Sequence, residues 1–548
     1  MKRLGFMLVF IGIAGWLNAQ IDSRIPSDKP KLIVGIVVEQ MRHDYIYKFW
    51  DKLSEGGFKR LLNEGTYCKN ANFNYQFTQT AVGHATIATG TSPSYHGIVA
   101  EEWYTSLNDK VVNCVADENY KTVGGSYTAG RVSPKQLLTS TIGDEIRLAN
   151  YNKSKVLSIS LQSESAILSG GITANAAYWY DEENGKWVTS SYYMPELPGW
   201  IKDFNDKKLA DVYLTRSWET KYPIQSYAGY CLPDDNKFET GIEGRKTFPY
   251  NLAEMNKNES KKKYNLLKST PFGNTFTKDF AIASIVNEQL GKDDNTDLLM
   301  ISFSSTESIG KNFGPESVEV MDAFLQLDKD IEHLLSFLDQ EIGKQNLLVF
   351  LTSDHGVAQS PEYLADKGIP VGFFNQNGAI SLLTSYLNAV YGKGNWIRNY
   401  YAQQLFLNRN LIEDSKLNLA DFQQKAAQFL LQFSGVANTV TSTTLLNSYF
   451  PDGIFSKMQK NYNQKRSGDI LINLLPGWVE KNGGTTGHNS PYSYDTHVPL
   501  IWYGWRVKRA TILDPVDMTD IAPTISYYLN IANPNASVGK PIIGLLAQ

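Results

Sequence analysis

The stretch KLIVGIVVE at residues 31–39 decides the fold class. Its apolar residues are mostly β-branched and follow one another without the polar alternation of a strand that faces water on one side. Such a run is typical of a strand buried on both faces, as in a parallel sheet with helices above and below it. The run ends in a carboxylate, Glu39.

Comparable apolar runs recur at 155–160, 297–303, 346–353 and 498–504. Amphipathic patterns lie between them, most clearly over 318–342, where apolar residues recur at three and four positions. Strands that alternate with such helices predict an α/β sandwich with a largely parallel central sheet and helices on both faces. Two blocks rich in Tyr and Asn interrupt this rhythm, and we expect them to be cap insertions near the active face, at about 175–265 and about 375–475.

The N-terminus carries the pattern of a secretory signal. Two basic residues after Met1 precede the apolar run LGFMLVFIGIAGWL, and Asn18-Ala19-Gln20 follows as a cleavage site. We therefore expect a signal peptide over 1–20 and a mature domain over 21–548. No later segment is as long and apolar, so the mature protein is expected to have no stable membrane span and to be periplasmic or secreted.

Composition and cysteine content narrow the remaining classes. The formal net charge of -4 argues against nucleic-acid binding, which normally requires a basic excess. An exported compartment permits disulfides, and of the three cysteines we favour a Cys68–Cys114 bridge, with Cys231 left as a thiol. The spacing contains no CxxC motif, so a cysteine zinc site is not indicated.

Polar side chains collect where the predicted strands end. Glu39 follows the first strand, Glu307 follows the run at 297–303, and Asp354-His355 follow the run at 346–353, while His488 precedes the last strand. Each alone is typical of a turn or a helix cap. In open α/β sheets the ligand lies beyond the carboxyl ends of the strands, so together these groups predict a functional site.

Thr80 in the stretch NYQFTQTAVGHATIATG, residues 74–90, allows two interpretations. Threonine is a favoured helix N-cap, and Gly90 suits the end of a short helix, so Thr80 can be purely structural. A hydroxyl at a helix N-terminus also lies at the positive end of the helix dipole, where an anion such as phosphate is stabilised.

The motifs that carry these residues resemble the alkaline phosphatase superfamily, most closely its PafA-type, phosphate-insensitive bacterial members. They are VVEQMRHDYI (37–46), NYQFTQTAVGHAT (74–86), HGIVAEEWY (96–104), SFSST (302–306), TSDHG (352–356) and GTTGHNSPYSYDTHVPL (484–500). The resemblance implies an alkaline phosphatase-like sandwich, two zinc ions that clamp a small phosphate ester, and a Thr nucleophile at position 80. It further implies metal ligands at Glu39, Thr80, Glu307, Lys311, Asp354, His355 and His488.

Several of these metal positions depart from the family pattern. Glu39 and Glu307 stand where the family has Asp, and the extra methylene moves the oxygen by roughly 1.5 Å. Lys311 stands where the family has His, and a protonated amine has no lone pair for a metal. The resemblance therefore implies zinc as cofactor, with one ion or none instead of two.

The positions that grip phosphate are altered as well. Gln162 and Glu164 replace a Lys and an Arg of the family, and Glu101 replaces an Asn. A phosphate dianion would have to bind among five carboxylates and one ammonium group, which together carry a formal charge of -4 without metal. These are Glu39, Glu101, Glu164, Glu307 and Asp354, with Lys311. At about 4 Å each like-charge pair costs on the order of 4 kcal/mol at an effective dielectric constant of 20.

Three hypotheses follow for the mature protein. The first is a catalytically impaired or inactive pseudophosphatase, in which Lys311 occupies the space of a metal and neutralises carboxylates. The second is an active, metal-dependent phosphomonoesterase or phosphodiesterase that uses Thr80 as nucleophile. The third is a binding protein that recognises a glycan or a partner through the aromatic insertions.

Overall fold

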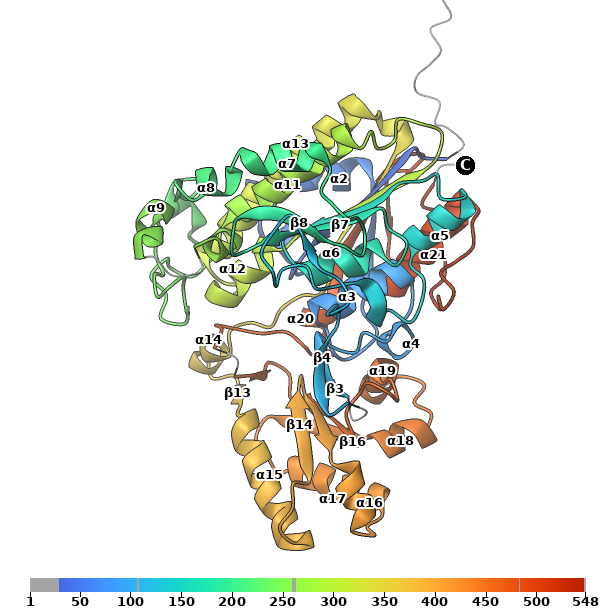
Figure 1. Cartoon of the computed structure of the whole chain (residues 1–548). Helices are drawn as coiled ribbons and strands as arrows, with labels where there is room; N and C mark the ends of the chain where they lie inside the picture. Colours follow the sequence, from blue (N-terminus) through green and yellow to red (C-terminus); the bar gives the residue numbers. More distant parts are fainter. Residues whose placement is uncertain (1–28, 106–107, 259–262, 482, 547–548) are drawn as a thin grey trace, which may run out of the picture.

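The computed structural model describes residues 29–105, 108–258, 263–481 and 483–546. It consists of an α/β body built around an eleven-stranded sheet. A smaller cap projects from this body at the bottom of Figure 1. The predicted signal peptide at 1–20 lies outside the described residues.

Five neighbouring strands at the middle of the sheet are parallel, and the strands at both edges include antiparallel ones, so the predicted largely parallel sheet is confirmed. In spatial order the strands are β20 (Ala510–Ile512), β2 (Thr66–Asn72), β19 (His497–Gly504), β12 (Leu347–Thr352), β1 (Leu32–Val38), β11 (Asp297–Phe303), β6 (Val156–Ser160), β7 (Ala176–Asp181), β8 (Lys186–Ser190) and β5 (Thr122–Val123), with β21 (Val516–Asp517) paired to β2.

Strand β1 is buried along its whole length and divides its side chains between two cores. Leu32, Val34 and Ile36 belong to the core under one layer of helices, and Ile33 and Val37 to the core under the other. The first layer contains α2 (Phe58–Glu64), α11 (Pro271–Asn287) and α13 (Val318–Glu341), and the second contains α3 (Thr80–Thr89), α5 (Ile142–Ala149), α6 (Ser163–Gly170) and α21 (Ile521–Leu529). The unbroken apolar run at 31–39 is thus explained by burial on both faces.

The cap has a sheet and a core of its own. Its strands are β14 (Ile397–Tyr401), β15 (Gln404–Leu407), β17 (Ile470–Leu474) and β16 (Val436–Thr441), and they pack against α15 (Gln376–Tyr391), α16 (Arg409–Asp414) and α17 (Leu419–Leu430). The hairpin of β3 (Glu102–Thr105) and β4 (Lys110–Asn113) reaches from the body toward this cap, where Tyr104 packs edge-on against Phe406.

The interpretation of 175–265 as one insertion requires a correction. Strands β7 and β8, at the start of this block, extend the central sheet next to β6. Their aromatic side chains, including Trp179 and Trp187, fill the cores on the two faces of the sheet and do not form a separate cap. The aromatic composition of this stretch therefore reflects core packing.

The predicted Cys68–Cys114 bridge is wrong in this structure, where all three cysteines are free thiols. Cys68 lies in β2 opposite Leu500 of β19, and Cys114 follows β4. Both side chains are buried in apolar surroundings, and burial raises the pKa of the Cys68 thiol to about 12. Both cysteines thus serve as small apolar core residues.

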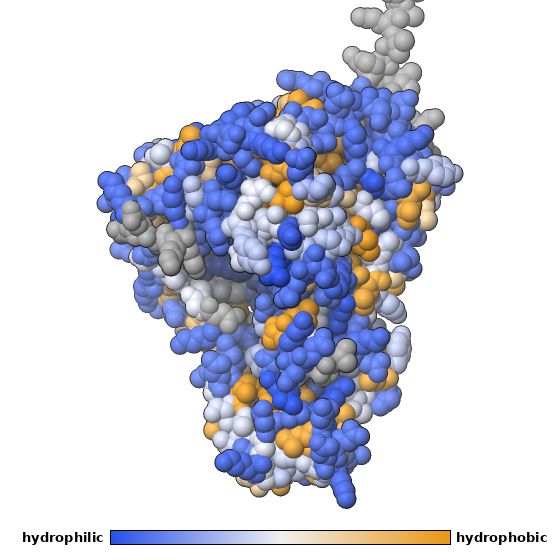
Figure 2. Space-filling view, viewed as in Figure 1, coloured by the Kyte–Doolittle hydropathy of each residue, from blue (hydrophilic) through white to orange (hydrophobic). Residues whose placement is uncertain are grey.

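The visible surface is largely hydrophilic, with scattered apolar side chains (Figure 2). Within the described ranges, none of the helices combines the length and the apolar character that crossing a bilayer would need.

Candidate active site at the sheet edge

The polar groups that the sequence placed at strand ends meet at one edge of the central sheet. Glu39 follows β1, Asp354 and His355 follow β12, and Glu307 lies in the first turn of α12 (Ser305–Phe313) directly after β11. Strand β19 runs antiparallel to β12, so the segment before it, with His488, reaches the same edge. Because β19 runs in the opposite direction to β12, His488, which precedes β19, lies beside residues that follow the parallel strands.

Thr80 is the first residue of α3, and the N-cap position before it is held by Gln79. Its hydroxyl Oγ1 lies 3.2 Å from Glu307 Oε1 and 3.3 Å from His355 Nε2. The capping interpretation is therefore wrong, whereas Gly90 ends the helix in the left-handed conformation as expected. Gly83 allows the close approach of α3, because a Cβ there would lie 2.3 Å from the carbonyl oxygen of Asp354.

The Glu307 carboxylate is the centre of the site. Its Oε1 accepts from Thr80 and lies 2.8 Å from Lys311 Nζ, 3.3 Å from His488 Nε2 and 3.8 Å from His355 Nε2. Burial alone would raise its pKa, but the charge of Lys311 outweighs burial and lowers the pKa well below its usual range. Glu307 is therefore ionised at neutral pH.

Lys311 lies one turn after Glu307 on α12, and its side chain is still 45% exposed. Burial of part of the chain opposes the charge on the ammonium group, but Glu307 and Glu101 raise its pKa above the usual value. The group is therefore a permanent cation in the site.

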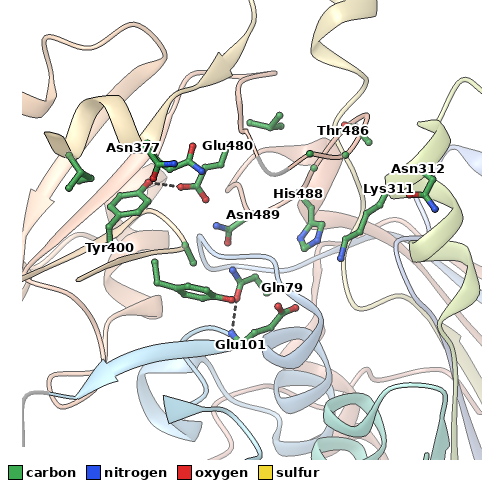
Figure 3. Close-up of a pocket in the computed structure, with 18 residues that line it drawn as sticks. Gln79, Glu101, Lys311, Asn312, Asn377, Tyr400, Glu480, Thr486, His488 and Asn489 are labelled. Carbon is green, nitrogen blue, oxygen red and sulfur yellow. Dashed lines mark hydrogen bonds between the residues drawn. The ribbon is translucent and has the colours of Figure 1, made fainter. Parts of the chain in front are cut away.

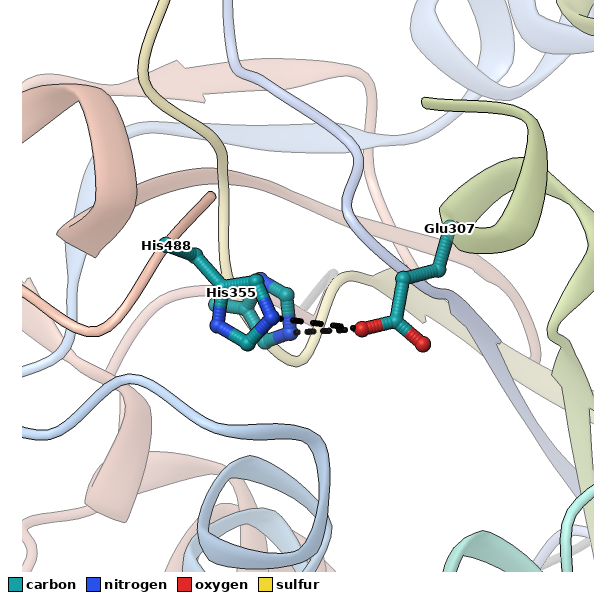
Figure 4. Close-up of side chains that lie close together, drawn as sticks. All are labelled: Glu307, His355 and His488. Carbon is teal, nitrogen blue, oxygen red and sulfur yellow. Dashed lines mark ion pairs between the residues drawn. The ribbon is translucent and has the colours of Figure 1, made fainter. Parts of the chain in front are cut away.

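His355 and His488 stack with ring centroids 3.9 Å apart, and both face Glu307 (Figure 4). The Nδ1 of His355 donates to the carbonyl of Gly356 at 2.7 Å, and the Nδ1 of His488 to that of Thr78 at 2.6 Å. Burial lowers the pKa of both imidazoles, that of His488 to about 4. Both rings are therefore neutral, with the lone pair of Nε2 directed into the site.

Among the described residues, Glu307, His355 and His488 form a group whose ligand atoms all lie within 4.8 Å of one another. Asp354 is a neighbour of this group, with Oδ2 3.3 Å from His355 Nε2. That oxygen is buried and has no hydrogen-bond partner among the described residues, while Oδ1 accepts from the backbone N–H of Gln40 and of His355. Burial, together with the charge of Glu39, raises the pKa of Asp354 to about 7.

Glu39 lies apart from the imidazoles and is held by hydroxyl groups. Its Oε1 accepts from Ser165 and Ser302 at 2.7 Å and from Ser304 at 2.9 Å. His84 Nε2 lies 3.5 Å from the same oxygen, and although burial favours the neutral acid, this contact lowers the pKa of Glu39. Sequence reasoning missed His84; its position four residues after Thr80, on the same helix face, was the available signal.

Gln162 joins two of the carboxylates that the sequence placed at strand ends. Its Nε2 donates to Glu39 Oε2 at 2.9 Å and to Glu307 Oε2 at 3.1 Å. The side-chain amide of Gln162 is therefore engaged in hydrogen bonds with both carboxylates. Glu164, two residues on, accepts a 3.1 Å hydrogen bond from the neighbouring Ser163 hydroxyl.

Glu101 lines a pocket of about 810 Å³ between the body and the cap (Figure 3). Burial of its carboxyl raises the pKa of Glu101 to about 7. On the cap side, Tyr400 donates to Glu480 at 2.5 Å. Lys311 is the single Lys or Arg among the described residues that line the pocket, so its wall is chiefly neutral and acidic. Its amide and hydroxyl groups come from Gln79, Asn312, Gln376, Asn377, Tyr400, Tyr401, Thr486 and Asn489.

This arrangement, on a sheet of this topology, defines a member of the alkaline phosphatase superfamily. Within it the chain belongs to the type I phosphodiesterase / nucleotide pyrophosphatase family, whose model matches residues 33–497. The crystal structure of wild-type alkaline phosphatase PafA is similar over 95% of this chain and 99% of that one, with a TM-score of 0.91 and 38% identity.

The relatives in sequence are similar over nearly their whole length. The chain is 39% identical to alkaline phosphatase PafA of Elizabethkingia meningoseptica, over 99% of each protein. It is 40% identical to alkaline phosphatase PhoV of Synechococcus elongatus, over 94% of this chain and 93% of that one. A protein of Myroides odoratus named a calcium-transporting ATPase is 41% identical over 95% of each.

Proposed function

We propose that this chain is an exported phosphatase-fold protein whose phosphomonoesterase activity is impaired or lost. One observation carries the proposal: the ammonium group of Lys311 lies 2.8 Å from Glu307 Oε1. The carboxylate that would bind a metal in the family pattern is thereby neutralised by the protein itself.

The residues present do not fit a pair of zinc ions. Lys311 offers no lone pair, and Glu39 directs Oε1 at three hydroxyl groups and Oε2 at the Gln162 amide. Binding a metal at Glu39 would require these donors to leave a buried carboxylate, which costs about 1–3 kcal/mol for each polar group left unpaired. We therefore derive no two-metal step for this chain.

The charge of the pocket also opposes a phosphate dianion. Gln162 is committed to Glu39 and Glu307, so its amide is not free to grip a phosphoryl oxygen. Glu101 and Glu480 contribute carboxyl groups to the wall, against the one ammonium group of Lys311. A ligand with less negative charge than a phosphomonoester suits this pocket better.

A second candidate, a hydrolase with one metal ion, is favoured by the two imidazoles. Both Nδ1 atoms carry the proton, so the Nε2 lone pairs face the ionised Glu307 carboxylate at 3.3 and 3.8 Å. Lone pairs directed at an anion are unfavourable unless a cation lies between them. His355, His488 and Glu307 would hold such an ion, which would supply a Lewis acid beside the Thr80 hydroxyl.

A third candidate, ligand binding without catalysis, is favoured by the pocket itself. Its volume suits a small molecule, and Tyr400 and Tyr401 offer aromatic surface next to amide groups on the cap side. This combination is typical of sites for neutral, hydroxylated ligands such as sugars, and it is compatible with loss of catalysis.

Metal analysis of the purified protein, combined with turnover of p-nitrophenyl phosphate, separates these candidates. We expect at most one zinc per chain and a turnover at least tenfold below that of PafA, with no further loss in Thr80→Ala. Two zinc ions per chain, or turnover within tenfold of PafA that Thr80→Ala abolishes, would contradict the proposal. One zinc with Thr80-dependent turnover of a diester would favour the second candidate.

A further inference from the structure

Asn489, directly after His488, lines the pocket between the body and the cap and has a strained backbone. Its φ angle is 92°, in the left-handed region that favours glycine over residues with a side chain. Asparagine tolerates this region better than most residues, but still at a cost in conformational energy. Glycine would relieve the strain at this position, so the presence of an amide side chain requires an explanation.

The backbone of Asn489 is fixed from both sides of the pocket. Its N–H donates to the hydroxyl of Thr78 at 3.1 Å, and Thr78 lies in the body two residues before Thr80. Its carbonyl accepts from Gln403 Nε2 at 2.9 Å, and Gln403 lies in the turn between β14 and β15 of the cap. These two hydrogen bonds hold the position of the residue without using its side chain.

The side-chain amide of Asn489 lies at the pocket wall and is incompletely bonded. The residue is 6% exposed, and its Oδ1 is buried without a hydrogen-bond partner within the described part of the chain. In the view of Figure 3, Asn489 is drawn between His488 and the Tyr400–Glu480 pair. Buried polar atoms are nearly always paired in folded proteins. An unpaired amide oxygen at the wall of a pocket therefore indicates that a ligand supplies the missing donor.

The other groups of the wall indicate the chemistry of that ligand. The ammonium group of Lys311 is already ion-paired within the site, and the wall carries the carboxyl groups of Glu101 and Glu480. Burial raises the pKa of both carboxyl groups, that of Glu101 to about 7. Neither a strong anion nor a strong cation therefore finds a full opposite charge. A neutral hydroxyl group both donates and accepts, so it can bond to amide, carboxyl and ammonium groups alike.

The size and the aromatic surface of the pocket suit a sugar ring. Its volume of about 810 Å³ is within the range of small-molecule sites. Tyr400 and Tyr401 line the same pocket on the cap side and offer apolar surface beside their hydroxyl groups. A sugar likewise combines C–H groups with hydroxyl groups around its ring.

We propose that Asn489 selects a neutral carbohydrate in this pocket, with its side-chain amide bonded to two neighbouring hydroxyl groups of one sugar ring. An amide presents a donor and an acceptor side by side, and neighbouring hydroxyl groups can supply the complementary pair. The assignment rests on the proposed function, because a pocket that still turned over phosphomonoesters would have to admit a phosphate dianion instead.

A ligand-observed NMR titration of the wild-type protein tests the class of ligand. The probes are the methyl glycosides of D-glucose, D-galactose, D-mannose and N-acetyl-D-glucosamine, which differ in the arrangement of neighbouring polar groups. We expect saturable binding of at least one of them. Saturable binding of none of these probes would overturn the proposal.

Asn489→Gly separates recognition from a structural role, because it removes the amide and relieves the strained φ angle together. We expect the best-bound glycoside to bind this variant about tenfold more weakly or not at all, as loss of one or two hydrogen bonds implies. The midpoint of thermal unfolding should stay equal or rise, since glycine adopts this backbone conformation without strain. An amide with a purely structural role would give a lower midpoint and an unchanged affinity, and either result would overturn the proposal.

Asn530→Gly is the matched control. Asn530 also has a positive φ angle, 51°, but it is exposed at the end of α21 and does not line the pocket. This variant should leave the affinity for the glycoside unchanged. A loss of affinity equal to that of Asn489→Gly would contradict recognition by the Asn489 amide.

Turnover of p-nitrophenyl phosphate, measured on the same preparation, distinguishes failure of this inference from failure of the proposed function. Background turnover without glycoside binding contradicts only the carbohydrate assignment. Turnover within tenfold of PafA that Thr80→Ala abolishes contradicts the proposed function, whatever the binding result.

Discussion

Lys311 Nζ lies 2.8 Å from Glu307 Oε1, one helical turn earlier on α12. The same carboxylate oxygen also accepts a hydrogen bond from the Thr80 hydroxyl and faces the imidazoles of His355 and His488. The proposed nucleophile is therefore bonded to a carboxylate that an internal cation already neutralises. This relationship determines which substitutions can restore phosphatase chemistry.

Restoring only the two phosphate-binding side chains should not restore phosphatase activity. We expect Gln162→Lys with Glu164→Arg to leave p-nitrophenyl phosphate turnover near background, because Lys311 still excludes a zinc ion. Adding Glu39→Asp, Glu307→Asp and Lys311→His should raise zinc content toward two per chain and produce measurable turnover. The two sets should be strongly non-additive, since residues that act as a unit contribute little until the unit is complete.

Thr80→Ala in the five-substitution background is the control for this experiment, and it should return turnover to background. Strong activity from the first pair alone would show that Lys311 is not the obstacle. In that case the one-metal hydrolase becomes the better account of the site.

The amide of Gln162 should be important for stability because it bridges two buried acids. Gln162→Glu replaces the shared donor by a third carboxylate of the same shape, and we expect it to lower the free energy of unfolding by about 1–3 kcal/mol. Gln432→Glu, at an exposed position, should change it by less than about 0.5 kcal/mol. Urea denaturation followed by circular dichroism measures both, and equal effects would refute the bridging role.

Stability should fall as the pH rises from about 4 to about 8, in part because of Asp495. Burial raises the pKa of this carboxyl from 3.8 to about 8, although the Ser490 hydroxyl donates to it at 2.6 Å. Over this window the folded state holds a proton that the unfolded state has released, so unfolding is favoured as the pH rises.

Asp495→Asn removes this titrating proton and should flatten the dependence of the urea midpoint on pH between 5 and 8. Other acids with raised pKa values, including Asp354 and Glu101, should preserve part of the slope. A slope in Asp495→Asn as steep as in the wild-type protein would contradict the assignment.

Export should remove the first twenty or so residues. We expect the mature protein to begin near Gln20 or Ile21, since basic residues and an apolar run precede a small-residue site. Intact-mass spectrometry of periplasmic or secreted material measures this directly. A mass that includes Met1 in such material would refute cleavage.

The sequence alone was sufficient for the largely parallel central sheet and for the sheet edge at which the polar strand ends meet. The run at 31–39 predicted a strand buried on both faces, and Val34 and Val37 do lie in cores on opposite faces of β1. The polar residues at strand ends predicted a common edge, because chain direction in a parallel sheet fixes which ends meet. The burial of a strand and its direction in the sheet follow from local residue patterns, so a single sequence is enough to predict them.

The partners of each side chain at that edge were decided only by tertiary structure. Gln162 donates hydrogen bonds to Glu39 and Glu307, which lie 123 and 145 residues away in the sequence. His84 comes within 3.5 Å of Glu39 because α3 packs close to the sheet. Hydrogen bonds form over about 2.7–3.2 Å, and the packing of distant elements sets distances at that scale, which residue pattern does not encode.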